Sequence, residues 1–542
     1  MKLVLLQPPI QDFYDTGIRL QPIGLAYLKS AVKKFLPGIE VVIKDYHHGW
    51  GRRTVSMPQE LAYLKEFYAW PDRSPFSSFH QYYHFGADFE SLARDVAGEK
   101  PDLVGISSLF SPYYREVLRA AEAIKRRRNV PIILGGSHVS ALPNRMLEPE
   151  SVDFVIRGEG ERPLVEFLKS WNNGRHFELV PNLGFKKDGK MILNSLEENY
   201  PIEDLPEPDL SDFSPGDYLF EKRPLSFVIT SRSCPHRCSF CSVHKTFGFR
   251  YRRRSVGRVL EEIQRRYEDG VRVFDFEDDN LTYYKEDMKE LCRRLAAVFP
   301  KQDVQFLAMN GISYLSLDEE LLRLMKQAGF THLNLALVSS DVTVRETTKR
   351  PHTVKKYEEV VACAFRMGFK VVSYQILGLP NESLDSMIQT LLFSARQPVL
   401  LGASLFYLTP DSPIARSFPE ATESDVLKSR LTAMAIETES FAREDLYTLF
   451  LTTRILNYLK GLEFEAEVLS FKEALEISRN QGVRSALGVD ILQKLLNGEG
   501  FYASTNQGYR KIHRFREPLF SRVWSDLEKI RTQDGKWILL NP

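Results

Sequence analysis

The sequence predicts an α/β protein with a doubly wound (Rossmann-like) N-terminal domain, a partial (β/α)6 barrel and a small, mainly helical C-terminal domain. Short Val/Ile/Leu runs alternate with stretches of helical periodicity, first over residues 1–180 and again over residues 225–410. Near-continuous apolar runs are typical of parallel strands that are covered on both faces. A chain of 542 residues is also long enough for about two or three domains.

The first domain is predicted to span residues 1–180, with a Pro-rich, acidic linker over 181–224. An aromatic-rich insertion at about 47–90 interrupts it, and this insertion is either a lid or a segment packed on the surface. The apolar runs predict strands within 2–9, 40–46, 101–109, 130–138 and 152–161, and the helical periodicity predicts helices over 23–32 and 114–124.

The second domain is predicted to span residues 225–420, and the remaining residues, 421–542, are predicted to form helices. Six strand–helix repeats in the second domain are enough to curl into a partial barrel. The expected strands lie within 225–231, 271–280, 304–310, 331–340, 370–380 and 400–410, with helices after each of the first five.

The composition excludes several classes of partner. The formal net charge is +1, so the whole chain carries no electrostatic reason to bind nucleic acid or an anionic membrane. No apolar run approaches the roughly 18 residues that a membrane span needs. The start, "MKLVLLQPP", predicts a buried strand, because its apolar run is too short for a signal peptide. We expect a cytoplasmic protein without a membrane span.

Three of the five cysteines form the pattern Cys234-x3-Cys238-x2-Cys241 directly after a predicted strand. A loop at this place lies at the C-terminal mouth of a parallel barrel, where active sites of such folds gather. Three thiolates can hold three irons of a [4Fe–4S] cluster and leave the fourth iron open to a substrate or cosubstrate. The alternative is a zinc site in which His236 or His244 is the fourth ligand.

The cysteine pattern, with Phe240 as the aromatic residue of C-x3-C-x-aromatic-C, and the six repeats together resemble the radical S-adenosylmethionine (SAM) superfamily. The resemblance implies that the three cysteines are catalytic, that they hold a [4Fe–4S] cluster and that SAM binds the open iron. It further implies that an external one-electron donor, such as flavodoxin or ferredoxin, drives formation of a 5′-deoxyadenosyl radical.

Residues outside the cysteine loop are assigned to SAM from the same resemblance. "EDDN" (277–280) ends the second strand, where the family approaches the SAM amino group, and "QILGLPNES" (375–383) resembles the element beside the adenine. Val338 and Asn310 depart from the family, which often has glutamate and arginine at these places. The residues expected to bind SAM are Phe240, Asp278, Asp279, Ser339, Gly378, Pro380 and Glu382.

The strand ends of the first domain together resemble the cobalamin-binding domain that one branch of this superfamily carries. Small residues at these ends would let a broad ligand lie against the backbone. The loop "QPPIQDFYDTG" (7–17) lacks the histidine that classical cobalamin domains place below the cobalt, so the lower axial position would be empty, water-filled or approached by another side chain. The residues expected to bind cobalamin are Gln7, Ser107, Ser108, Gly135, Gly136, Ser137, His138, Glu159 and Gly160.

These resemblances imply an enzyme that transfers a methyl group to an unactivated carbon of a small-molecule, lipid or peptide substrate. Ring formation, rearrangement or oxidation with the same cofactors is an alternative, as is the same fold without cobalamin. A non-catalytic iron–sulfur or cobalamin sensor is an alternative of another class. The arginines within 250–254 could suggest nucleic-acid binding, but no aromatic-interleaved basic surface extends beyond them, and we expect no nucleic-acid partner.

Overall fold

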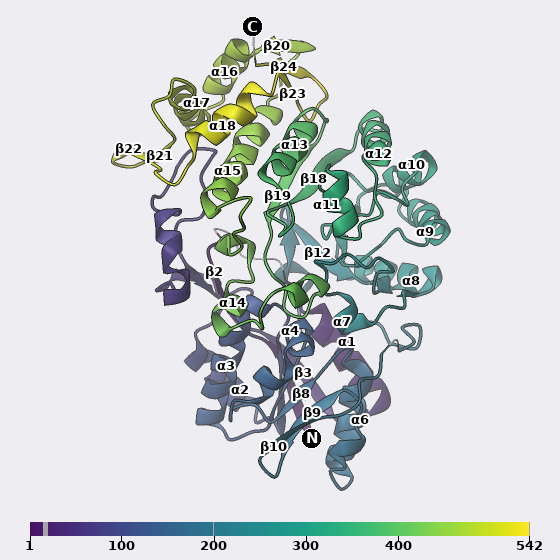
Figure 1. The fold of residues 1–542 in the computed structure, drawn as a ribbon. Helices are drawn as coiled ribbons and strands as arrows, with labels where there is room; N and C mark the ends of the chain where they lie inside the picture. Colours follow the sequence, from purple (N-terminus) through teal and green to yellow (C-terminus); the bar gives the residue numbers. More distant parts are fainter. Residues whose placement is uncertain (15–19, 199, 541–542) are drawn as a thin grey trace. The chain divides into compact units, whose positions relative to one another are not determined.

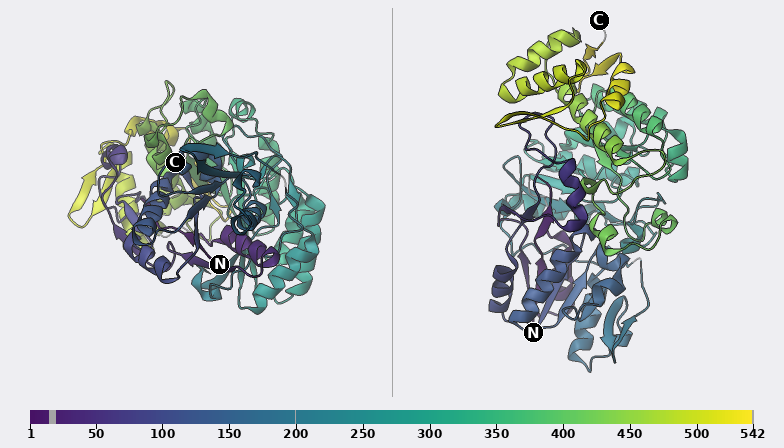
Figure 2. Two further views of the ribbon diagram at one scale, coloured as in Figure 1. Left: turned by 90° about the horizontal axis from the view of Figure 1, so that it is seen from below. Right: turned by 60° about the vertical axis from the view of Figure 1, so that its left-hand side comes forward.

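The computed structural model describes residues 1–14, 20–198 and 200–540. Contacts within the chain divide it into two compact units, and neither is continuous in sequence (Figures 1 and 2). Each unit is described separately below. Unit 1 consists of residues 1–56, 82–280 and 409–429, and unit 2 of residues 57–81, 281–408 and 430–542.

A seven-stranded sheet forms the centre of unit 1, with the strand order β10-β9-β8-β7-β6-β1-β3. Five of these strands are parallel, and β1 pairs with β3 on one side and with β6 on the other, so that Leu3 lies opposite both Val41 and Leu103. An antiparallel hairpin of β9 and β10 closes one edge. The strands are β1 (Lys2–Gln7), β3 (Glu40–Asp45), β6 (Leu103–Ser107), β7 (Ile132–Gly135), β8 (Phe154–Ile156), β9 (Leu183–Lys187) and β10 (Lys190–Leu193).

Helices cover both faces of this sheet, as the apolar strands require. On one face, α1 (Ile23–Phe35) and α6 (Glu161–Asn172) share a core cluster with β1, β3 and β8. On the other face, α2 (Phe89–Gly98) and α3 (Tyr114–Arg127) pack on β6 and β7, with the short helices α4 (Ser137–Ala141) and α5 (Pro143–Leu147). The predicted doubly wound fold is therefore confirmed.

The order of the strands reverses between β1 and β6. The chain proceeds from β1 outward to β3, and it then returns to β6 and proceeds to β7 and β8 on the opposite side. In doubly wound sheets a ligand crevice forms at such a point, beyond the carboxyl ends of the strands. Gln7 ends β1 and Ser107 ends β6, so both residues lie at this switch point.

The first barrel strands also belong to unit 1. Strand β12 pairs in parallel with β15, with Leu225 opposite Val273, and the segment between them contains the cysteine loop. A separate antiparallel sheet is formed by β2, β5 and β4. The elements are β2 (Ile10–Asp12), β4 (Arg52–Thr54), β5 (Tyr83–Phe85), β11 (Leu219–Phe220), β12 (Arg223–Val228), β13 (Ser231–Arg232), α7 (His244–Phe247), β14 (Arg252–Arg253), α8 (Val256–Glu268), β15 (Val273–Phe276) and α14 (Glu423–Leu427).

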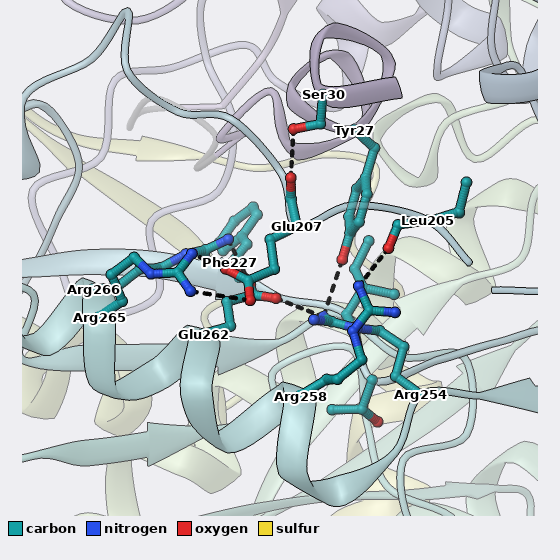
Figure 3. Close-up of polar contacts among 12 residues, drawn as sticks. Tyr27, Ser30, Leu205, Glu207, Phe227, Arg254, Arg258, Glu262, Arg265 and Arg266 are labelled. Atoms are coloured by element: carbon teal, nitrogen blue, oxygen red, sulfur yellow. Dashed lines mark hydrogen bonds and ion pairs between the residues drawn. The ribbon is translucent and has the colours of Figure 1, made fainter. Parts of the chain in front are cut away.

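The Pro-rich segment between the sheet and β12 is attached to helices on both sides (Figure 3). Ser30 of α1 donates a hydrogen bond to the Glu207 carbonyl, and the Glu207 carboxylate pairs with Arg265 of α8. Arg258 of α8 donates to the Leu205 carbonyl at 2.6 Å. Sequence composition predicted a linker over residues 181–224, but β9 and β10 place residues 183–193 in the sheet. The contacts above fix the segment that follows along helices α1 and α8.

A buried polar chain lies beside this segment and joins α1 to α8 (Figure 3). Arg254 donates to the Tyr27 hydroxyl at 3.3 Å and pairs with Glu262 at 2.6 Å. Glu262 also pairs with Arg266 at 2.5 Å, and Arg266 donates to the Phe227 carbonyl at 2.6 Å. Because the buried carboxylate lies between two guanidinium groups, its charge is compensated.

Unit 2 continues the strand–helix alternation. As predicted, the six strands β12, β15, β16, β17, β18 and β19 alternate with helices along the described chain. Strands β17, β18 and β19 form a parallel sheet in that order. The elements are α9 (Lys285–Val298), β16 (Gln305–Leu307), α10 (Glu319–Ala328), β17 (His332–Val338), α11 (Val342–Thr347), α12 (Val354–Arg366), β18 (Lys370–Leu377), α13 (Leu384–Ala395) and β19 (Leu400–Leu405).

The last part of unit 2 is mainly helical, and residues 57–81 of the aromatic insertion pack against it. Tyr447 of α15 is buried and donates a hydrogen bond to the Phe67 carbonyl at 2.8 Å, and Phe79 stacks on Phe450. No helix in the described part of the chain has the length and apolar character of a membrane span. The elements are α15 (Arg443–Lys460), β20 (Val468–Ser470), α16 (Phe471–Asn480), α17 (Val483–Leu496), β21 (Tyr502–Thr505), β22 (Gly508–Lys511), α18 (Glu517–Ser525), β23 (Lys529–Arg531) and β24 (Trp537–Leu539).

Candidate active site

The cysteine loop, residues 233–251, leaves and re-enters unit 1 through a two-residue antiparallel ribbon. Ser231 pairs with Arg253 and Arg232 pairs with Arg252, which brings the two ends of the loop together. Within the loop the Cys241 amide donates to the Cys238 carbonyl at 3.1 Å, so these two residues form a turn. Phe240, between them, is half-buried.

The three thiols of the loop lie close enough to affect one another. Burial raises the pKa of Cys241 to about 12, and the neighbouring Cys234 and Cys238 add to this increase. Burial also raises the pKa of Cys234, whereas a hydrogen bond from the Asn280 side chain opposes the increase. None of these cysteines is in a disulfide. Three cysteine side chains thus converge, and because metals bind cysteine as thiolate, a metal bound here would displace thiol protons.

The second barrel strand is followed by two aspartates with different surroundings. Asp278 is buried and accepts hydrogen bonds from the Thr230 amide at 3.1 Å, from the Thr230 hydroxyl at 2.6 Å and from the Ser231 hydroxyl. Asp279 is exposed, and one of its oxygens accepts a hydrogen bond from the Ser233 amide at 3.1 Å. Asp278 therefore supports the strand that leads into the cysteine loop, whereas Asp279 retains acceptor capacity.

The other residues that the sequence assigned to SAM lie in unit 2. Glu382 accepts hydrogen bonds from the amides of Gly378 and Leu379 at 3.1 and 3.3 Å, so its carboxyl group stabilises the loop after β18. Burial raises the pKa of Glu382 to about 8, although these amides and the Ser339 hydroxyl oppose the increase. Ser339 is buried against Thr390, and Pro380 is half-buried.

The end of β17 has an unusual backbone. Val338 has a φ of 69°, in the left-handed region that a β-branched residue rarely adopts, and the strand register shifts between Ala336 and Val338. Arg345 donates hydrogen bonds to the carbonyls of Ser339 and Ser340, which holds the next residues in place. Strain of this kind persists only where the surroundings impose it, and it is common at functional sites.

A cavity of about 270 Å³ lies at the switch point of the sheet in unit 1. Its walls come from the carboxyl ends of β1, β6, β7 and β8, from the first turns of α1 and α6, and from the segment 229–247. Glycines keep it open, because a Cβ on Gly105 would lie 2.6 Å from a Leu5 methyl carbon and one on Gly160 would lie 3.0 Å from a Leu28 methyl carbon.

Six of the nine residues that the sequence assigned to cobalamin line this cavity, namely Gln7, Ser107, Gly135, Gly136, Glu159 and Gly160. Ser108, Ser137 and His138 do not line it. His138 is buried and shares a hydrogen bond of 3.0 Å with the Ser111 hydroxyl. Burial, with a smaller contribution from Arg145, lowers the pKa of His138 to about 4, so the imidazole is neutral.

Among the residues of the cavity wall that the sequence reasoning missed are Tyr27, Arg232, Thr246 and Phe247. Three of these belong to the ribbon and loop that carry the cysteines, so the cavity touches both the sheet domain and the cysteine loop. Residues 15–17 of the loop without a histidine lie outside the described residues. No histidine, cysteine or methionine is among the described residues that line the cavity.

Among the described residues, no group of three or more His, Cys, Asp or Glu side chains is arranged to hold a single metal ion. His244, a possible zinc ligand, stacks on Phe249 with 4.6 Å between the ring centres, and burial lowers the pKa of this histidine. Sulfurs that hold a four-iron cluster bind different irons, so they need not meet at one point.

Two family models match the chain. The "Radical SAM superfamily" model matches residues 228–394, and the "B12 binding domain" model matches residues 78–168. The first range contains the cysteine loop and the strands from β15 to β18. The second contains β6, β7 and β8 with five of the six glycines that line the cavity.

Curated relatives cover most of the chain. An uncharacterized methyltransferase, PH0819, of Pyrococcus horikoshii is 28% identical over 73% of this chain and 78% of its own. Cytidylyl-2-hydroxyethylphosphonate methyltransferase of Streptomyces wedmorensis is 25% identical over 76% of this chain and 79% of its own. The anaerobic magnesium-protoporphyrin IX monomethyl ester cyclase of Cereibacter sphaeroides is also 25% identical, over 62% of this chain and 56% of its own.

A solved structure has the same fold. The radical SAM methyltransferase TsrM of Kitasatospora setae, with cobalamin and a [4Fe–4S] cluster bound, superposes with a TM-score of 0.58 over 76% of each chain at 17% sequence identity. The sheet with helices on both faces, the cysteine loop after β12 and the two matching models agree with this similarity. The chain therefore carries a B12-binding domain followed by a radical SAM domain.

Proposed function

We propose that the protein is a cobalamin-dependent radical SAM methyltransferase that acts on an unactivated carbon of an organic substrate. The observation that carries this proposal is a single compact unit in which three converging thiols lie on a loop that also walls a glycine-lined cavity. When bound, a cluster with an open iron supplies reductive cleavage of SAM, and cobalamin supplies a methyl carrier.

Cys234, Cys238 and Cys241 would hold the [4Fe–4S] cluster. These ligands fit an iron–sulfur cluster, because thiols are soft ligands. The described loop contains three cysteines and no fourth sulfur-bearing residue. Asn280 donates to the Cys234 sulfur at 3.5 Å, and such contacts orient a ligand and adjust its electron density. The chain's own task here is to hold three sulfurs and to leave one metal position accessible.

Asp279 would accept a hydrogen bond from the ammonium group of SAM, since it is exposed beside the loop and carries a carboxylate. Asp278 would support the SAM site without contacting SAM, because its oxygens already accept hydrogen bonds from Thr230 and Ser231. In unit 2, Gly378 would let the adenine approach the backbone, and Glu382 would keep that loop in shape. Phe240, Ser339 and Pro380 remain proposed contacts of SAM.

The cavity at the switch point would receive part of cobalamin, because it is mostly apolar and edged by glycines. Gln7, Ser107, Glu159 and Gly160 would offer polar atoms to cobalamin. His138 would instead stabilise the fold through its hydrogen bond with Ser111. No histidine is among the described residues of the cavity wall, so this wall would offer the cobalt no imidazole ligand.

Methyl transfer is favoured over ring formation. The two methyltransferases match over 78% and 79% of their own lengths, whereas the cyclase matches over 56%. TsrM has also been solved with its tryptophan substrate bound, and this supports a small organic molecule as the substrate class. A flavodoxin or ferredoxin would supply the electron.

Anaerobic reconstitution of the full chain with iron, sulfide and hydroxocobalamin tests this function. We expect corrin absorption, about four irons per chain, and deoxyadenosine release when SAM and dithionite are added. A substrate that gains one methylene unit in mass supports methylation. A product of unchanged or lower mass would contradict methylation and indicate rearrangement or oxidation. A protein that contains both cofactors but does not cleave SAM would indicate a sensor.

Cys238→Ala is the variant that tests the cluster assignment. It should abolish deoxyadenosine release and retain corrin absorption, because the cavity wall does not include Cys238. Cys292→Ala is the matched control, since Cys292 is a buried thiol on α9 and should be dispensable for both readouts. Iron content and deoxyadenosine release that are unchanged in Cys238→Ala would refute the assignment.

A further inference from the structure

The base of the cysteine loop is fastened to the B12-binding domain by four charged side chains. Arg232 and Arg252 face each other across the ribbon that closes the loop. Arg232 donates to Glu159 at 2.6 Å and to both oxygens of Glu161, and Arg252 pairs with Glu159 at 2.7 Å. We call Glu159, Glu161, Arg232 and Arg252 the clamp.

The clamp is almost completely shielded from water. The side chains of Arg232 and Glu159 are 5% and 2% exposed, and those of Arg252 and Glu161 are 7% and 8% exposed. Two guanidinium groups face two carboxyl groups. Arg232 holds the pKa of Glu161 below its ordinary value although burial alone would raise it, whereas burial raises the pKa of Glu159 although Arg232 and Arg252 oppose the increase. Removing one partner of such a buried set leaves an uncompensated charge, so the clamp has one preferred arrangement.

Aromatic rings complete the surroundings of Arg232. Its guanidinium group lies 5.4 Å from the ring centre of Tyr27 on α1 and 5.6 Å from that of Phe247 in the cysteine loop. Contacts of this length are within the range of cation–π attraction. Arg232 therefore touches the B12-binding domain through Tyr27 and the two glutamates, and it touches the loop through Phe247.

The same residues form part of the cavity wall. Tyr27, Glu159, Glu161, Arg232 and Phe247 all line the cavity at the switch point. Within the described part of the chain, the Nε of Arg232 is buried without a hydrogen-bond partner. A buried unpaired donor costs free energy, and an acceptor on a ligand in the cavity would offset that cost. A group that enters the cavity thus contacts the clamp directly.

We propose that the clamp couples occupation of the cavity to the position of the cysteine loop, with Arg232 and Glu161 as positioning residues. The inference rests on the proposed function, because it takes the cavity to receive part of cobalamin. A ligand that fixes Arg232 fixes the ribbon two residues before Cys234. By reciprocity, a loop ordered by its cluster should raise the affinity of the cavity for its ligand.

Hydrogen exchange on the full, anaerobically reconstituted protein tests the coupling. In the wild type, hydroxocobalamin should slow amide exchange in peptides that cover residues 233–251 by about fivefold or more. In Arg232→Lys most of this slowing should be lost, because a lysine keeps one charge but cannot bridge two carboxylates as a guanidinium does. The EPR spectrum of the reduced cluster should respond to hydroxocobalamin in the wild type and not in the variant.

Two further variants keep the test decisive. Glu161→Gln removes one charge with little change of shape, and it should also reduce the slowing of amide exchange. It replaces Arg232→Lys as the test if that variant does not fold. Arg265→Lys is the matched control, because Arg265 forms an exposed pair with Glu207 away from the cavity, and it should behave like the wild type. Wild-type slowing and a wild-type EPR response in both clamp variants would overturn the proposal.

Failure of the proposed function gives a different result. If the wild-type protein does not bind hydroxocobalamin, the cofactor assignment fails, and the coupling fails with it. If the wild type binds hydroxocobalamin and exchange in residues 233–251 does not change, cobalamin stays assigned and only the coupling is overturned.

Discussion

The side-chain amide of Asn280 donates a hydrogen bond to the sulfur of Cys234 at 3.5 Å. Asn280 follows β15, and Cys234 follows β13, so the contact joins the ends of two neighbouring segments of unit 1. Donors to cluster sulfurs stabilise the reduced state, because the added electron increases the negative charge on sulfur.

Asn280→Ala should therefore lower the reduction potential of the cluster. A hydrogen bond of about 1 kcal/mol corresponds to about 40 mV for one electron. An EPR-monitored redox titration measures the shift, and Asn172→Ala serves as control because Asn172 is an exposed residue at the end of α6. A potential that is unchanged in Asn280→Ala would mean that this amide does not reach the cluster.

Gly135 and Gly136 should respond differently to alanine. Gly136 has φ 121° and ψ 179°, and a Cβ there would lie 2.5 Å from the Ser108 carbonyl oxygen, so Gly136→Ala should cost about 2 kcal/mol or more. Gly135 lines the cavity, and the nearest atom to its Cβ would be 3.9 Å away. Gly135→Ala should fold normally and bind cobalamin more weakly.

Denaturant unfolding and absorbance titration with hydroxocobalamin measure these two effects. Equal stability of the two variants would show that the backbone at Gly136 relaxes without cost. Unchanged cobalamin affinity in Gly135→Ala would remove this glycine from the proposed contact surface.

Buried His138 predicts a pH dependence of stability. Its pKa is about 4 in the folded protein and about 6.5 when unfolded, so below pH 6.5 the unfolded state binds a proton that the native state excludes. The stability that depends on neutral His138 is complete above pH 6.5 and falls as the pH approaches 4. The loss between pH 7 and pH 5 should be about 2 kcal/mol.

Unfolding by urea at pH 7 and pH 5, with His138→Gln for comparison, checks this dependence. Glutamine can still bond Ser111 but does not titrate. The variant should therefore lose about 2 kcal/mol less than the wild type over this range. The same loss in both proteins would show that other groups cause the dependence.

Tyr447 should hold the aromatic insertion in place. Its hydroxyl is buried and donates to the Phe67 carbonyl at 2.8 Å, so Tyr447→Phe leaves a carbonyl without this donor and should cost about 1–2 kcal/mol. Limited proteolysis should cut residues 57–81 faster in this variant. Tyr509→Phe removes an exposed hydrogen bond to Asp490, and it should leave both stability and proteolysis unchanged.

The main elements followed from local patterns in the sequence. The apolar stripe from Ile23 to Val32 predicted α1, and the Val/Ile/Leu runs predicted β1, β6 and β7, because helical and strand periods differ. The cysteine spacing located the loop of the candidate site directly, since loop ligands are close in sequence. Periodicity and spacing are local signals, so they identified helices, strands and a loop whose residues are close in sequence.

The clamp could not be predicted in this way. Arg232 meets Glu159 and Glu161 across about 70 positions of sequence, as the separations of 73 and 71 positions show, and no periodic signal links them. Ser107 and Ser108 illustrate a second limit. Ser107 is the last residue of β6 and Ser108 follows it directly, but successive side chains along a strand direction point to opposite faces, and only Ser107 lines the cavity.

The discontinuity of unit 1 bears on how the chain matures on the ribosome. Its last segment, residues 409–429, returns to the B12-binding domain and the cysteine loop, where the Ile414 amide donates to the Ser239 carbonyl at 2.8 Å. A nascent chain that has not yet released these residues lacks part of the shell around its metal-binding sulfurs. Insertion of iron and sulfide into the intact arrangement therefore requires that residues 409–429 have been made and released, and earlier stages are those at which oxygen or a chaperone would meet the bare thiols.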